Sequence, residues 1–164
     1  DNIIREFCTV NMPAKKEFTK IGSDCYIMAY CHIAHDSIVH DHITMANQTT
    51  LGGAVEIFDF ANIGLNVSIH PHCKIGSYSM IGMGNTITKN VLPYAIIINS
   101  IFSNINNIGL TRNNFSIEDI QKIYSIYKNN FLNNLDQNND KFSVEISSFI
   151  KNSKRDSYLP NLKI

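Results

Sequence analysis

The sequence predicts a hexapeptide β-helix, a prism of stacked triangular coils, followed by an α-helical appendage. An aliphatic residue recurs at every sixth position through twelve repeats without a miss. These residues are Ile21, Ile27, Ile33, Val39, Met45, Leu51, Ile57, Ile63, Ile69, Ile75, Ile81 and Ile87. A period of six fits neither the helical repeat of 3.6 residues nor the alternation of a simple strand. It is typical of a stacked repeat architecture.

A second lane of residues supports the same fold. Four positions after each aliphatic residue the chain places a side chain that is small in most repeats. This lane holds Cys25, Cys31, Ser37, Ile43, Thr49, Val55, Ala61, Val67, Cys73, Ser79, Asn85 and Val91. A narrow interior needs large and small side chains in alternation to fill each cross-section. We therefore expect the three cysteines of this lane to be buried free thiols, not metal ligands or disulfides.

Three hexads complete one triangular coil. Residues eighteen apart therefore share a column on neighbouring rungs, roughly 4.8 Å apart, and residues distant in sequence can form one site. Glycines that directly follow the aliphatic residue are expected to give the backbone freedom to turn the corners. They are Gly22, Gly52, Gly64, Gly76 and Gly82.

The hexad pattern ends at Leu92-Pro93-Tyr94, and the period changes. After an apolar connection, Ser116 is expected to cap an amphipathic helix over residues 117–135, with Asp119 as its capping-box-like partner. A polar loop leads to a second predicted helix over residues 143–154. We divide the chain into a β-helix domain, residues 1–100, and a C-terminal helical region, residues 101–164.

Charge and hydropathy exclude two classes of partner. Lys and Arg number 14, as do Asp and Glu, so no global basic field attracts nucleic acid. No apolar run approaches the roughly 20 residues that a bilayer-spanning helix needs, and no signal peptide is evident. We predict a cytoplasmic protein without a transmembrane segment.

The candidate chemistry lies among six histidines, four of them between positions 32 and 42. The column rule places Gly53 one rung from His35, and His70 above Gly52 in the adjoining column. An imidazole beside an accessible glycine N–H suits acyl transfer, which needs a general base and an oxyanion donor. Asp36 can orient or stabilise the imidazolium.

Two other interpretations of the histidines stay open. His32 and His35 can begin a metal site with His70 or Asp36, although the column geometry does not obviously close such a site, so we predict no metal. The remaining histidines, His40, His42 and His72, are expected to lie on a solvated face.

Several strings carry a resemblance to a known family. They are Ile21-Gly22-Ser23-Asp24, His32-Ile33-Ala34-His35-Asp36, Leu51-Gly52-Gly53, Asp59-Phe60-Ala61-Asn62-Ile63-Gly64, Ile69-His70, Pro93-Tyr94, Gly109-Leu110-Thr111-Arg112 and Phe115-Ser116. On these residues, and along almost its whole length, the chain resembles the bacterial UDP-N-acetylglucosamine acyltransferases of lipid A biosynthesis. The most specific element is the His-Ile-Ala-His-Asp string.

The resemblance implies a left-handed parallel β-helix that forms a homotrimer, with active sites in clefts between neighbouring prisms. It implies an acyl carrier protein thioester as donor, with the carrier docking on basic residues near the C-terminal helices. The implied acceptor is UDP-N-acetylglucosamine or a related UDP-amino sugar. No cofactor is implied, because a thioester carbonyl is already activated and the base only removes one proton.

The resemblance also implies roles for individual residues. His35 matches the family's general base, and Gly53 matches the glycine whose N–H stabilises the oxyanion. Asp36 matches the acidic neighbour of the base. His32 and His70 match histidines that line the site and help to place the substrate.

Three further residues match substrate-binding positions of the family. Asn106 and Arg112 flank the Gly109-Leu110 pair and are expected to contact substrate. Met83 falls where the family carries its acyl-length ruler. A bulky side chain there in place of glycine predicts a shorter acyl chain.

The chain departs from the family around the substrate pockets. Ala54 stands where the family usually has a histidine, and Asn11 replaces another. The segment Ile98-Asn99-Ser100 replaces Gln-Gly-Asn, and Asn113 replaces a basic residue. Losing such polar and charged contacts favours changed nucleotide-sugar specificity. The alternatives are therefore another sugar acceptor or a coenzyme A donor, or a non-catalytic paralogue.

Overall fold

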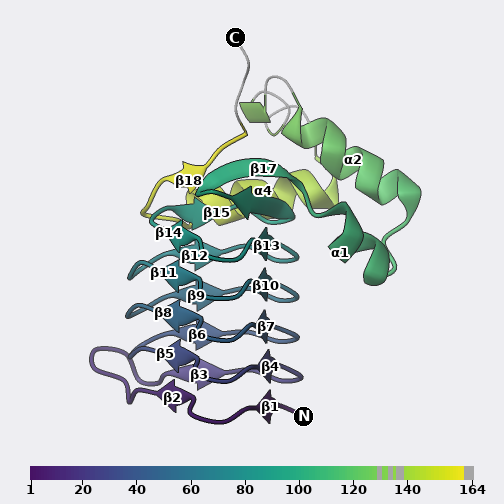
Figure 1. Ribbon diagram of the computed structural model, residues 1–164. Helices are drawn as coiled ribbons and strands as arrows, with labels where there is room; N and C mark the ends of the chain where they lie inside the picture. The colour runs from purple at the N-terminus through teal and green to yellow at the C-terminus, as the bar shows by residue number, and fades with distance from the viewer. Residues whose placement is uncertain (129–130, 133–134, 136–138, 161–164) are drawn as a thin grey trace.

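The protein is a three-walled prism of short parallel strands that carries helices at its C-terminal end (Figure 1). The computed structural model describes residues 1–128, 131–132, 135 and 139–160. Sheet A comprises, in spatial order, β1 (Ile3–Ile4), β4 (Tyr26–Ile27), β7 (Thr44–Met45), β10 (Asn62–Ile63), β13 (Met80–Ile81), β16 (Ala95–Ile98) and β17 (Ile101–Ile105). Sheet B comprises β14 (Thr86–Ile87), β11 (Ser68–Ile69), β8 (Thr50–Leu51), β5 (His32–Ile33) and β2 (Thr9–Val10). Sheet C comprises β18 (Ser157–Tyr158), β15 (Asn90–Val91), β12 (Lys74–Ile75), β9 (Glu56–Ile57), β6 (Ile38–Val39) and β3 (Lys20–Ile21).

The rungs stack in the register that the hexads predict. In sheet B, His32 lies opposite Thr50, and Thr50 lies opposite Ser68. The backbone N–H of His32 donates to the Thr49 carbonyl at 2.9 Å, so the hydrogen bonds run from rung to rung. The predicted columns of residues eighteen apart are confirmed.

Both predicted lanes face the interior. Every aliphatic position from Ile27 to Ile87 is buried, and the second lane is buried with it. The cysteines of that lane are free and buried, as predicted. Burial raises the pKa of the Cys31 and Cys73 thiols to about 11. These thiols therefore stay protonated and act as small core hydrophobes.

The expected role of the glycines was wrong. The corners are turned by residues three positions after the aliphatic residue, which adopt positive φ although most are not glycine. Examples are Asp36 at φ 63° and Ala54 at φ 58°. The glycines after the aliphatic residue are needed for close approach instead: a Cβ on Gly64 would lie 2.6 Å from the Ile81 carbonyl oxygen of the next coil.

The apolar connection after the hexads continues sheet A. Strands β16 and β17 pair antiparallel with a register shift between Ile96 and Ile97. The helices α1 (Asn107–Arg112), α2 (Ile117–Tyr127) and α4 (Lys141–Lys151) follow. Sequence reasoning missed the hairpin because its alternation is irregular.

The helix boundaries differ from those predicted. The Ser116 hydroxyl caps α2 by accepting the Asp119 N–H at 3.1 Å, as expected. Helix α2 nevertheless ends at Tyr127, because Lys128 adopts an extended conformation. The predicted continuation toward residue 135 falls partly on residues 129–130 and 133–134, outside the described part. Helix α4 begins before residue 143, because the Asp140 carboxylate accepts the Phe142 N–H at 2.9 Å.

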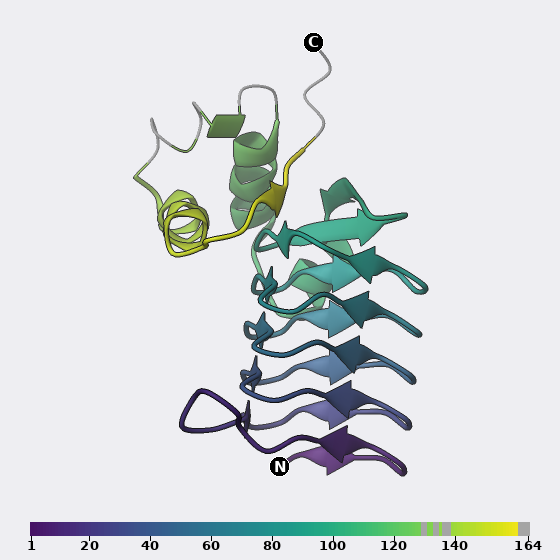
Figure 2. The ribbon, with the colours of Figure 1, turned by 90° about the vertical axis from the view of Figure 1, so that its left-hand side faces the viewer.

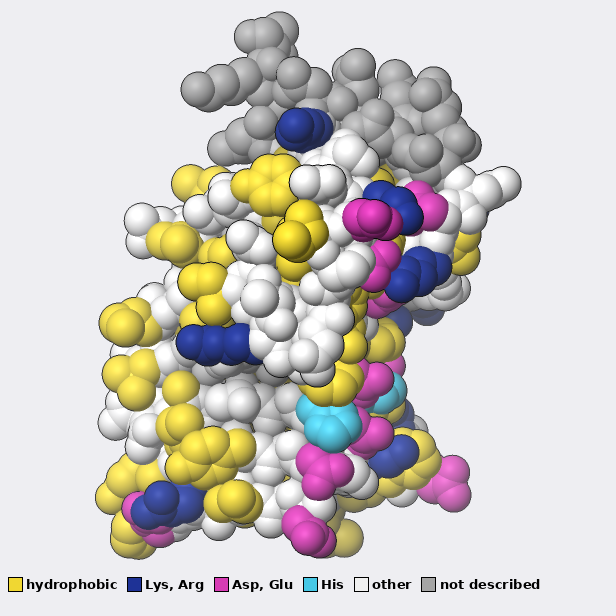
Figure 3. All heavy atoms as spheres, turned by 90° about the vertical axis from the view of Figure 1, so that its right-hand side faces the viewer, with side chains coloured by type: hydrophobic (Ala, Val, Ile, Leu, Met, Phe, Trp, Pro, Cys, Tyr) yellow, Lys and Arg dark blue, Asp and Glu magenta, His cyan; other side chains and the backbone are white. Residues whose placement is uncertain are grey.

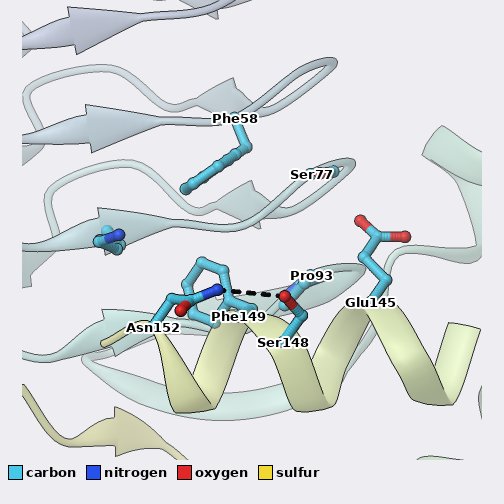
Figure 4. Close-up of a pocket in the computed structure, with 8 residues that line it drawn as sticks. Phe58, Ser77, Pro93, Glu145, Ser148, Phe149 and Asn152 are labelled. Atoms are coloured by element: carbon cyan, nitrogen blue, oxygen red, sulfur yellow. Dashed lines mark hydrogen bonds between the residues drawn. The ribbon is translucent and has the colours of Figure 1, made fainter. Parts of the chain in front are cut away.

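Helix α4 packs against the prism. The Phe149 ring meets the Phe58 ring edge-on, with centroids 5.8 Å apart. Figure 4 shows both rings, with Glu145 and Asn152 from the same helix, around a cavity of about 250 Å³. The Glu145 carboxylate accepts a hydrogen bond from the buried Tyr94 hydroxyl. The helix is therefore anchored through an aromatic contact and a buried polar contact.

After α4 the chain returns to the prism as a strap, residues 155–158. Strand β18 of this strap pairs with β15 and extends sheet C (Figure 2). The Arg155 guanidinium donates to the Thr88 carbonyl at 2.7 Å and to the Pro71 carbonyl at 3.0 Å. Because β17 and β18 both join the prism's sheets, the region after residue 100 is not purely helical, and the division at residue 100 stays a proposal.

Within residues 1–128, 131–132, 135 and 139–160, no helix has the length and apolar character needed to span a bilayer.

The lane of aliphatic residues should dominate stability. We predict that Ile57→Ala, at a fully buried position, lowers the free energy of unfolding by about 2–5 kcal/mol. Ile117→Ala is the matched control, because Ile117 is 76% exposed at the start of α2 and should change it by no more than about 0.5 kcal/mol. Chemical denaturation of both variants measures this, and equal losses would contradict the interior lane.

Candidate active site

His35 lies at a prism corner just after β5, and its side chain is half-exposed. Its Nδ1 is 2.8 Å from Oδ2 of Asp36. An ionised carboxylate only accepts hydrogen bonds, so Nδ1 carries the proton. In the neutral ring, Nε2 then holds the free lone pair. His35 is thus oriented to accept a proton at Nε2.

Asp36 is held by a loop from the preceding rung. This loop, between β2 and β3, protrudes from the prism in Figure 2. The buried Asp36 carboxylate accepts the backbone N–H groups of Ala14 at 2.9 Å, Lys15 at 3.0 Å and Lys16 at 2.8 Å. The Lys16 N–H, followed by His35, lowers the pKa of Asp36 well below its usual range. Asp36 is therefore ionised at neutral pH.

Gly53 lies one rung from His35 and directly against its ring. A Cβ at position 53 would stand 2.7 Å from both Cε1 and Nε2 of His35. The backbone N–H of Gly53 donates a hydrogen bond to no residue in the described part of the chain. At two equivalent corner positions, the backbone N–H donates to an aspartate of the next rung. The Ser23 N–H donates to Asp41 at 2.7 Å, and the Asp41 N–H donates to Asp59 at 2.9 Å. Gly53 therefore leaves an unused donor beside the imidazole, in the predicted juxtaposition.

The other two predicted histidines belong to sheet B, His32 within β5 and His70 directly after β11. His70 follows β11, and its Nδ1–H donates to the Pro71 carbonyl at 3.0 Å, which leaves Nε2 free. Pro71 is in turn close to Gly52, where a Cβ would lie 2.6 Å from the proline Cδ. His32, in β5, has Nδ1 2.8 Å from the Thr9 hydroxyl. His32, His35, Gly53 and His70 thus belong to successive rungs of sheet B and its edge.

The remaining predicted residues lie with sheet A instead. Asn106 and Arg112 line one cavity of about 430 Å³ between sheet A and α1, together with His42. The Asn106 amide is already engaged, donating to the Tyr78 carbonyl at 2.8 Å and accepting the Gly109 N–H at 3.0 Å.

Met83 also belongs with sheet A, since it follows β13. It is 74% exposed. Figure 3 shows hydrophobic side chains gathered along one edge of the sheet A side of the prism. One chain therefore does not bring Met83, Asn106 and Arg112 to the His35 corner, because they stand on a different wall.

Two features of this corner were missed by sequence reasoning. The three amides of residues 14–16 that hold Asp36 carry no residue signature, because any residue but proline supplies an N–H. Arg155 shares the Pro71 carbonyl with His70, but it lies in a tail without periodicity. Both contacts become visible only in the folded structure.

The metal alternative has no support in the described part of the chain. There, no three His, Cys, Asp or Glu side chains gather in an arrangement that could hold a metal ion.

The repeats match a known family model. Residues 18–53 match the model described as bacterial transferase hexapeptide (six repeats). Hexapeptide repeats of this kind wind into a left-handed parallel β-helix, which is the fold class of this chain. Fold and repeat together define a hexapeptide-repeat protein of the transferase type.

Longer relatives define the family more narrowly. An acyl-[acyl-carrier-protein]–UDP-N-acetylglucosamine O-acyltransferase from Thiobacillus denitrificans is 37% identical over 131 residues, 77% of this chain and 51% of the relative. Its namesake from Herminiimonas arsenicoxydans is 34% identical over 166 residues, 99% of this chain and 63% of the relative. A solved UDP-N-acetylglucosamine acyltransferase structure superposes with a TM-score of 0.91 at 32% identity, covering 98% of this chain and 68% of that one.

The chain belongs to the UDP-N-acetylglucosamine acyltransferase family. It spans between half and two thirds of the length of these curated relatives. The resemblance stated from the sequence is therefore confirmed at the level of family and fold.

The contacts of Asp36 predict a pH dependence of stability. Because its pKa is lowered in the folded state, ionised Asp36 stabilises the fold above the unfolded pKa of about 3.9. That contribution is lost as the pH falls below about 3.9 toward the folded pKa. We predict that Asp36→Asn has a lower free energy of unfolding than the wild type at pH 7. This difference in unfolding free energy should become smaller as the pH falls. Asparagine tolerates the positive φ, so the substitution removes charge without backbone strain.

Urea unfolding from pH 7 down to pH 2 measures this difference. Asp156→Asn is the control, because the exposed Asp156 carboxylate accepts no hydrogen bond from a described residue. A difference for Asp36→Asn that stays constant with pH would contradict an ionised, hydrogen-bonded Asp36.

Proposed function

We propose that this protein is an acyltransferase of early lipid A biosynthesis. It would move a hydroxyacyl or acyl group from an acyl carrier protein thioester to a hydroxyl of UDP-N-acetylglucosamine or a related UDP-amino sugar. The observation that carries the proposal is the His35–Asp36 pair beside the unused Gly53 N–H. A base and an oxyanion donor within one corner are the two groups that this reaction needs.

The corner supports a simple sequence of steps. Nε2 of His35 takes the proton from the sugar hydroxyl as its oxygen attacks the thioester carbon. The Gly53 N–H donates to the oxyanion of the tetrahedral intermediate. Collapse breaks the carbon–sulfur bond, and the imidazolium returns its proton to the leaving thiolate. Asp36 stabilises the imidazolium between these transfers.

A homotrimer is part of the same proposal. The His35 corner is open to solvent, whereas Asn106 and Arg112 line the cavity on sheet A and Met83 follows strand β13 of that sheet. A neighbouring prism that presents its sheet A wall to this corner would complete the pocket and exclude water. His32 and His70 would help to place the substrate. We also assign the protein to the cytoplasm, where it would act without a cofactor.

A second candidate shares the chemistry but differs in substrate. Ala54 and Asn113 replace a histidine and a basic residue of the family, and the Asn106 amide is engaged within its own chain. These features favour another sugar acceptor or a coenzyme A thioester as donor.

Acyl transfer by wild type and His35→Gln tests the proposal. Purified protein is incubated with acyl carrier protein and coenzyme A thioesters of several lengths and with a panel of UDP-sugars, and products are followed by mass spectrometry. We predict that His35→Gln lowers the rate about 10²–10⁴-fold, the usual contribution of a general base. The preferred thioester length tests Met83 as the ruler.

His40→Gln is the matched control, because His40 contacts Glu56 and not the corner. Its rate should equal that of the wild type. Unchanged activity in His35→Gln would contradict the assignment of the base. No product from any donor and acceptor would favour the non-catalytic paralogue.

A further inference from the structure

A separate cavity of about 410 Å³ lies against sheet C, next to the candidate active site. It is lined by Lys15, Lys16, Asp36, Ala54, Glu56, His72, Lys74, Asn152 and Lys154. Two of these, Asp36 and Ala54, directly follow His35 and Gly53 in the chain. The cavity therefore begins where the catalytic corner ends.

The lining carries an excess of positive charge. Four lysines face two carboxylates, which leaves two positive charges without counting His72. Both carboxylates are already engaged. Glu56 accepts from Lys74 at 3.1 Å and from His40 at 3.2 Å. Burial raises the pKa of Glu56, but these two partners outweigh it and lower the pKa overall.

The other carboxylate is occupied as well, since Asp36 accepts the loop amides and the His35 ring. Lys15, Lys16 and Lys154 have no carboxylate partner within the described part of the chain. Like charges that converge on one cavity repel one another, and an anion between them relieves the repulsion.

These lysines are presented by backbone segments that the fold holds in place. The amides of Lys15 and Lys16 donate to Asp36 at 3.0 and 2.8 Å. Lys154 precedes Arg155, whose guanidinium is bound to the Thr88 and Pro71 carbonyls. Three separate segments thus bring cations to one cavity: the loop, strand β12 and the turn that directly precedes the strap.

We infer that this lysine-lined cavity is a phosphate-binding site for a substrate whose reacting group lies at His35. Several separate ammonium groups suit a phosphate anion, which they contact as point charges. The phosphate has two possible sources, the diphosphate of a nucleotide sugar and the phosphodiester of a pantetheine arm. The link to catalysis rests on the proposed function, but phosphate binding itself does not.

Calorimetric titration without turnover tests the site. The variant is Lys15→Gln/Lys16→Gln/Lys154→Gln, which keeps the amides that hold Asp36 and the Lys74–Glu56 pair. The first probe is inorganic pyrophosphate. We expect the wild type to bind it more weakly as salt rises and the triple variant to lose at least about tenfold in affinity, or about 1.4 kcal/mol. Lys122→Gln/Lys128→Gln/Lys141→Gln, with the same change of charge, should bind pyrophosphate like the wild type.

Further probes identify the source of the phosphate. Loss of affinity for UDP in the triple variant would assign the site to the nucleotide sugar. Loss of affinity for 4′-phosphopantetheine, with pantetheine unaffected, would assign it to the donor arm. Equal pyrophosphate affinity in the wild type and the folded triple variant would overturn the inference, as would an equal loss in the control variant. Failure of the acyl transfer assay alone would leave these binding results unchanged.

Discussion

The rung-to-rung ladder is the constraint on which the rest of the structure depends. Strands β1 to β15 have two residues each, so none is stable without the rungs above and below it. The ladder fixes the offset at eighteen residues, as the pairing of His32 with Thr50 shows. A side chain on one rung therefore meets a defined backbone group on the next. The contact of His35 with Gly53 is a product of this offset.

The candidate site uses what each corner leaves unpaired. A corner N–H without a rung partner can be capped, as at Ser23 by Asp41, or left without a partner among the described residues, as at Gly53. Glycine at position 53 also makes room for the imidazole. The loop amides keep Asp36 ionised, and Asp36 directs the His35 ring. The same loop carries Lys15 and Lys16 of the neighbouring cavity, so one segment supports both the Asp36 carboxylate and part of that cavity's positive charge.

The sequence was most informative where the period is strict. The hexads predicted the walls, the buried lanes and the pairing of His35 with Gly53, because each follows from a fixed offset. They gave the wrong role to the glycines. Gly64 allows the backbone of the next coil to come close, whereas a non-glycine residue, Ala54, turns a corner at positive φ. Backbone amides such as those of residues 14–16 leave no trace in residue type. The strap was missed because Arg155 acts through distant carbonyls, and the roles of the site residues stay proposals.

NMR spectra of the histidine rings test most directly whether the rung-to-rung ladder places the His35 ring in contact with Gly53. The measurement is nitrogen-labelled histidine NMR on the wild type and Gly53→Ala. The added Cβ would stand 2.7 Å from Nε2 of His35, so the ring must move. We predict that the hydrogen-bonded Nδ1–H signal of His35 shifts or disappears in Gly53→Ala, while that of His70 stays unchanged. A His35 signal identical to that of the wild type would contradict the contact on which the proposed site depends.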